Sequence, residues 1–139
     1  SPEVFKEVIL PKLKEVAALI QVPWVYHSDG NLLPVLEDWL TLGQNGMHPI
    51  EPAAMNIFEL KKAIGERICL VGNVEIDTLS LGTVKEVDKE VKEKIHTLAP
   101  GGRYIISSSN SLTNYCRPEN VLAMKEAIHS YGSYSELCN

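Results

Sequence analysis

The chain repeats one pattern four times: a short apolar segment, a polar turn and an amphipathic helix. The segments predicted as strands are residues 23–26, 46–50, 68–71 and 104–106. The helices that follow them are expected at about residues 32–42, 56–64, 83–98 and 118–131. Because strands that alternate with helices are joined by right-handed crossovers, the four units predict a parallel α/β sheet.

Local sequence signals support these helices. Thr83 and Glu86 fit a capping box, in which each residue bonds the backbone of the other. A further helix is expected ahead of the first unit, where Ser1 can cap it and Pro11 should interrupt it. Apolar spacing predicts two buried series, Leu33, Leu36, Trp39 and Leu40, and Val84, Val87, Val91, Ile95 and Leu98.

Four strand–helix units amount to half of a (β/α)₈ barrel. We therefore predict that residues 1–139 form one α/β domain, a half barrel of four parallel strand–helix units preceded by one helix. A flavodoxin-like open sheet is the alternative, and it would need a fifth strand. A half barrel exposes two strand edges, so we expect either further sequence that completes the ring or a homodimer of this chain.

Composition narrows the class of protein. The net charge of −5 argues against nucleic-acid binding, which needs a basic surface. No apolar run approaches the ~20 residues of a membrane helix. The three cysteines form no C-x-x-C pair and suit a reducing, cytoplasmic location. The first residue is not methionine, which favours a fragment or a trimmed chain.

Polar residues follow every predicted strand: His27 and Asp29, Glu51, Asn73 and Glu75, and Ser108 and Asn110. Since barrel chemistry sits at the carboxyl ends of the strands, we expect these side chains to share one rim. Such a set can bind a polar substrate, hold a metal through nitrogen and oxygen, or move a proton. The catalytic candidates are His27, Asp29 and Glu51.

Each of these residues also has a structural interpretation. His27 and Asp29 can form a hydrogen-bonded turn, Glu51 can be a solvated carboxylate, and Asn73 can stabilise its own turn. Cys69 is interpreted as packing. The other histidines are interpreted as structural or surface residues: His48, His96 and His129.

Several segments resemble the uroporphyrinogen decarboxylase superfamily in their order and spacing: residues 1–5, 27–30, 72–73, 104–107 and 118–120. The resemblance covers nearly the whole chain and implies the C-terminal half of a TIM barrel. It also implies a substrate-site role for Ser1, beside the rim candidates for substrate binding, Asn73, Ser108 and Asn110.

The superfamily that this chain resembles contains enzymes of two reaction types. Its decarboxylases use no cofactor, and their catalytic aspartate and substrate-binding arginines lie in the N-terminal half; a family histidine stands where this chain has Asn110. Its cobamide-dependent methyltransferases bind zinc through a His-x-Cys pair and a later cysteine. Here His27 matches the histidine, whereas Asp29 and Asn110 stand at the cysteine positions.

The resemblance implies carboxy-lyase chemistry on a tetrapyrrole or a similar polycarboxylate in the complete protein. The alternatives are a methyltransferase-like protein with a corrinoid partner and an altered metal site, or a non-catalytic half-barrel module. No cofactor is expected; zinc, if bound, would use His27, Asp29 and Glu51. The expected partner is a small molecule, not a nucleic acid or a membrane.

Overall fold

The sheet has four parallel strands in sequential order. The computed structural model describes residues 1–133, in which the strands are β1 (Val25–His27), β2 (Gly46–His48), β3 (Cys69–Val71) and β4 (Tyr104–Ile105). A flavodoxin-like sheet has the order 2-1-3-4-5, so the sequential order excludes it. The predicted half barrel, four parallel strand–helix units preceded by a helical segment, is confirmed.

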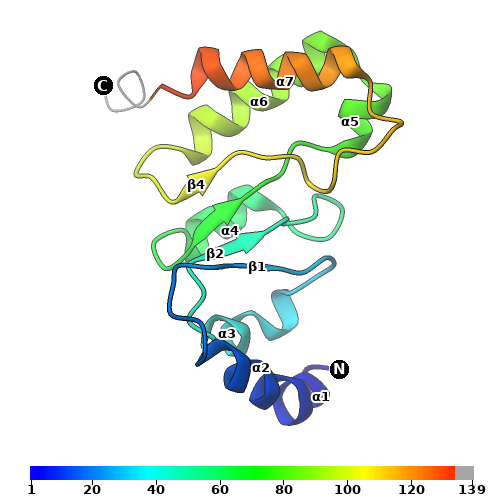
Figure 1. Cartoon of the computed structure of the whole chain (residues 1–139). Coiled ribbons are helices and arrows are strands. Elements are labelled where there is room, and N and C mark those ends of the chain that lie inside the picture. The colour runs from blue at the N-terminus through cyan, green and yellow to red at the C-terminus, as the bar shows by residue number, and fades with distance from the viewer. Residues whose placement is uncertain (134–139) are drawn as a thin grey trace.

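Helices connect the strands and cover one side of the sheet. They are α3 (Leu36–Leu40), α4 (Ile57–Ile64), α5 (Ile76–Leu81), α6 (Val84–Leu98) and α7 (Pro118–Tyr131). Figure 1 shows α6 and α7 beyond β4, at the opposite end of the molecule from the N-terminal helices. The sequence does not predict α5, because six residues are too few to show a helical period. Within residues 1–133, no helix has the length and apolar character needed to cross a membrane.

The N-terminal helical segment is interrupted where the sequence predicts. It consists of α1 (Pro2–Val4), the π-helical turn η1 (Phe5–Ile9) and α2 (Leu10–Ala17). Pro11 follows η1 closely, and since proline has no N–H, the regular α-helical bonding cannot continue through it. The Oγ of Ser1 accepts a hydrogen bond from the Val4 N–H at 3.4 Å, which confirms the predicted cap.

The two faces of the sheet differ in exposure, because successive side chains point to opposite sides. The face against the helices carries Tyr26, Met47, Leu70 and Tyr104, which the strand register aligns in one row. The other face carries Val25, His27, His48, Val71 and Ile105. Leu70 is 0 % exposed, whereas Ile105 is 54 % exposed. In a closed barrel this second face lines the interior, so a half barrel leaves it open.

Most of the predicted core is confirmed. Val87, Val91, Ile95 and Leu98 of α6 are buried. Trp39 is 1 % exposed, and its ring meets Tyr26 edge to face at 5.2 Å between ring centroids. The predictions that Leu33 and Val84 are buried are wrong: Leu33 is 50 % exposed and Val84 is 47 % exposed. The α-helix begins only at Leu36, and the 3₁₀ turn before it (Leu33–Val35) points Leu33 away from the core.

The capping box of α6 gives the first testable prediction. The Glu86 N–H donates to the Thr83 hydroxyl, and the Thr83 N–H donates to the Glu86 carboxylate at 2.7 Å. Thr83→Ala should lower the free energy of unfolding by about 1 kcal/mol, since it removes the acceptor. Urea unfolding followed by circular dichroism measures this. The exposed Thr97 of the same helix provides the control, Thr97→Ala; an equal loss in both variants would contradict the capping role.

Candidate functional site

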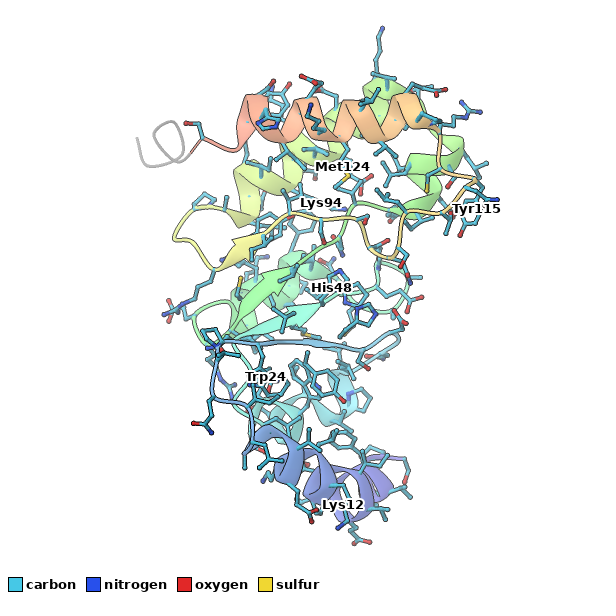
Figure 2. All side chains as sticks on the ribbon, viewed as in Figure 1. Lys12, Trp24, His48, Lys94, Tyr115 and Met124 are labelled. Atoms are coloured by element: carbon cyan, nitrogen blue, oxygen red, sulfur yellow. The ribbon has the colours of Figure 1, made fainter. Side chains whose placement is uncertain are left out.

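A cleft of about 520 Å³ opens at the carboxyl ends of the strands. Loops that follow all four strands contribute to its wall, which includes Asp29, Glu51, Glu75, Asp77, Asn110 and Tyr115. Figure 2 shows Tyr115 on the loop that leads into α7. The structure therefore brings four of the predicted rim residues to one cleft: Asp29, Glu51, Glu75 and Asn110.

Two imidazoles meet at the ends of β1 and β2. The strand register places His27 opposite His48, and their Nδ1 atoms lie 2.8 Å apart. This distance is that of a hydrogen bond in which one ring donates and the other accepts. Figure 2 shows His48 among the strand ends. The sequence-based interpretation of His48 as a structural or surface residue missed this pairing. The predicted strand 46–50 placed His48 inside the strand, whereas in the structure β2 ends at His48, as β1 ends at His27.

Asp29 lies on the other side of the His27 ring. Its Oδ1 is 3.7 Å from Nε2 of His27, and both side chains are more than half exposed. Because solvent screens such a pair, the contact adds little to stability. It does place a negative charge next to one nitrogen of His27 while His48 occupies the other. Asp29, His27 and His48 thus form a line along the rim.

His48 is held in its neutral form. Burial lowers the pKa of His48, and the neighbouring His27 lowers it further. A hydrogen bond to the Ser108 backbone and the charge of Asp29 act in the opposite direction but do not outweigh burial. The ring therefore accepts or donates a hydrogen bond without carrying a charge of its own at neutral pH.

Two backbone hydrogen bonds tie the first two loops of the rim together. The Gly30 N–H donates to Oε2 of Glu51 at 2.8 Å, and the Ser28 N–H donates to the His48 carbonyl at 3.0 Å. Glu51 thus braces the turn that carries Asp29 as well as lining the cleft.

The predicted substrate-binding residues differ in where they lie. Ser108 donates its hydroxyl to the Asn110 carbonyl at 2.7 Å, and Oδ1 of Asn110 accepts from the Ser111 N–H at 2.7 Å, so both serve their own turn. Ser1 caps α1 and is not part of the cleft wall.

The buried Asn73 supports the strand-end rim through hydrogen bonds to other elements. It is 1 % exposed, and its Nδ2 donates to the Ile50 carbonyl at 2.6 Å. Its own carbonyl accepts from Nζ of Lys94 at 2.8 Å, and Lys94 forms an ion pair with Glu90. Asn73 therefore has a structural role, but its side chain ties the loop after β2 to the loop after β3 instead of stabilising its own turn, as the sequence-based interpretation had it. Figure 2 shows Lys94 between α6 and the strands.

Tyr104 supports the same turn from β4. Its hydroxyl donates to the Gly72 carbonyl at 2.7 Å. Burial raises the pKa of Tyr104 far above its usual value, and the charge of Glu90 raises it further. The hydroxyl therefore remains a hydrogen-bond donor at any physiological pH.

The donors at the rim do not fit a thiolate zinc site. Within residues 1–133, no three His, Cys, Asp or Glu side chains gather closely enough to hold a metal ion. Cys116 is buried, with its Sγ 3.7 Å from the hydroxyls of Ser80 and Thr113. Burial raises the pKa of the Cys69 thiol, which disfavours the thiolate that binds metals. Cys138 lies outside the described residues.

A parallel half barrel with polar side chains at its strand ends defines a protein of the (β/α)-barrel class. The family model for uroporphyrinogen decarboxylase (URO-D) matches residues 1–131. The chain belongs to the URO-D family.

Known proteins similar to this chain include members with both chemistries. It is 29 % identical over 132 residues to the methylcobamide:CoM methyltransferase MtaA of Methanosarcina barkeri, covering 94 % of this chain and 38 % of that protein. It is 27 % identical over 133 residues to the uroporphyrinogen decarboxylase of Dichelobacter nodosus, covering 90 % and 36 %. A methyltransferase structure from Methanosarcina mazei matches with a TM-score of 0.80 and 28 % identity, covering 96 % and 38 %. The chain thus spans little more than a third of these relatives.

Proposed function

We propose that this chain forms part of the active site of a URO-D-family enzyme that transfers a proton to or from a small molecule at the strand-end cleft, as a carboxy-lyase does. The observation that carries the proposal is the line of Asp29, His27 and His48 along the rim. Imidazole is the side chain most often used for general acid–base catalysis, because its ordinary pKa lies near neutral pH.

The proposed roles follow from the contacts of each residue. His27 is exposed enough to reach a substrate, and the carboxylate of Asp29 lies beside its Nε2. When a carboxylate leaves as CO₂, the carbon that held it must take up one proton. A protonated His27 can supply that proton, and solvent can then restore it.

The charge of the cleft sets how a substrate would bind. Four carboxylates line it, and the described residues of its wall include no lysine or arginine: Asp29, Glu51, Glu75 and Asp77 are the charged groups. A polycarboxylate or a tetrapyrrole would therefore present its neutral part, or the one reacting carboxylate, to His27. Its other carboxylates would be anchored by groups elsewhere in a complete barrel.

Methyl transfer is the second candidate, because both MtaA of M. barkeri and the M. mazei structure are methyltransferases. A corrinoid partner belongs to this candidate alone. The zinc ligands considered for it are His27, Asp29 and Glu51; Nδ1 of His27 already pairs with His48, and Oε2 of Glu51 already accepts from the Gly30 N–H.

A non-catalytic half-barrel module is the third candidate. The open inner face, where Val25 is 49 % exposed, and the free edges of β1 and β4 favour pairing with another barrel half. We propose a homodimer where this chain occurs alone.

The Asp29→Asn substitution tests the proposed function. In the intact protein, CO₂ release from a panel of small carboxylic acids, uroporphyrinogen included, would be compared with methyl transfer from methylcobalamin to a thiol, each with and without a chelator. We expect CO₂ release that is insensitive to the chelator and falls about 10- to 100-fold in Asp29→Asn, the usual cost of removing a group that orients a working imidazole.

The exposed Glu93 of α6 provides the matched control, Glu93→Gln, which should keep full activity. Methyl transfer that the chelator abolishes, with no CO₂ release, would replace the proposal with the second candidate. Neither activity would favour the third.

A further inference from the structure

Both ring nitrogens of His27 have a polar neighbour, and Nδ1 is within hydrogen-bond distance of its own. Nδ1 lies 2.8 Å from Nδ1 of His48, and Nε2 faces Oδ1 of Asp29 at 3.7 Å. A neutral imidazole has one donor nitrogen and one acceptor nitrogen. A partner that occupies Nδ1 therefore decides both the tautomer of the ring and the direction in which Nε2 points.

His48 is well placed to be that partner, because the backbone fixes its position. β1 and β2 pair in register at His27 and His48, and the Ser28 N–H donates to the His48 carbonyl. The Ser108 backbone bonds the His48 ring from the β4 side. Contacts from three strands or their loops thus hold this imidazole against His27.

We infer that His48 is a positioning residue for His27: it binds Nδ1, fixes the tautomer of the ring and turns Nε2 toward Asp29, which is part of the cleft wall. Asp29 and Asn110 stand at the cysteine positions of the thiolate zinc site implied by the methyltransferase resemblance, so the site built on His27 differs from that site in its donors. This inference uses the proposed function only for the acid–base role of His27.

The charged groups around the pair agree with this arrangement. Asp29 faces His27 from the loop after β1. In the loop after β2, one carboxylate oxygen of Glu51 accepts a hydrogen bond from the Gly30 N–H. From the β4 side, the group in contact with the pair is the uncharged Ser108 backbone. No thiol joins these contacts among residues 1–133: the Cys69 Sγ lies 3.9 Å from the Leu70 carbonyl, and Cys116 is buried against Ser80.

Two substitutions at His48 separate positioning from mere packing. Asparagine can place an amide group close to the position of Nδ1, whereas leucine fills a similar space with no polar atom. In the intact protein with ¹⁵N-labelled histidine, NMR would report the tautomer of His27 in wild type, His48→Asn and His48→Leu. With only four histidines in the chain, the signals of His96 and His129 serve as internal references.

We expect one fixed tautomer of His27 in the wild type and in His48→Asn, and a tautomer mixture in His48→Leu. Zinc titration followed by dialysis should leave far less than one zinc per chain in the wild type. An unchanged His27 spectrum in His48→Leu would overturn the positioning role. One tightly held zinc that is lost in both His27→Ala and His48→Asn would show instead that the pair is a metal-ligand set. Neither readout involves turnover, so failure of the proposed reaction would leave this result standing.

Discussion

Replacing His27 with alanine should lower kcat/KM of the intact protein about 10²- to 10⁴-fold, the range that one general acid–base group contributes. The reason is geometric as well as chemical: His27 stands between Asp29 and His48, and its side chain is 54 % exposed at the rim. Removing it takes away the proposed proton donor and the ring that lies between Asp29 and His48.

His129→Ala is the matched control, because His129 is an exposed histidine of α7, away from the strand ends. It should keep wild-type kcat/KM, and circular dichroism should show both variants folded. Steady-state kinetics on the substrate found in the carboxylic-acid panel would measure the effect. A His27→Ala enzyme with less than a tenfold loss would assign the proton transfer to another group.

Replacing Glu90 with alanine should lower the free energy of unfolding by about 3–5 kcal/mol, the usual cost of breaking a buried ion pair by removing one partner. The side chain of Lys94 is 9 % exposed and that of Glu90 is 17 % exposed. Lys94 also donates to the Asn73 carbonyl, and Glu90 accepts from the Glu75 N–H at 2.9 Å. The variant would leave a buried ammonium group without its counter-charge and weaken the support of the β3 rim turn.

Urea unfolding measures this loss, and two further variants define its cause. Glu93→Ala removes an exposed carboxylate of the same helix and should change stability by less than about 0.5 kcal/mol. Glu90→Ala combined with Lys94→Met removes both charges and should recover much of the stability, because apolar replacement of a buried pair is often neutral. If Glu90→Ala and Glu93→Ala were equally stable, the pair would not be a structural support.

The four-unit pattern, the sequential sheet and the capping box of α6 could be predicted because they depend on neighbours along the chain. Apolar residues every three or four positions in α6 describe its buried side, and Thr83 lies three residues from Glu86, within one helical turn. Among the rim residues, Asp29 and Glu51 were predicted for a similar reason: parallel strands bring their carboxyl ends to one edge of the sheet.

The tertiary structure alone decided how those residues are used. His27 and His48 are 21 residues apart in the chain, and only the strand register brings their rings into hydrogen-bond contact. Likewise Asn73 turns inward because the Ile50 carbonyl and Lys94 come from other elements. A local pattern tells which residues can reach the rim of the sheet. Which of them meet there depends on side-chain directions set by long-range pairing, and no short stretch of sequence contains that information.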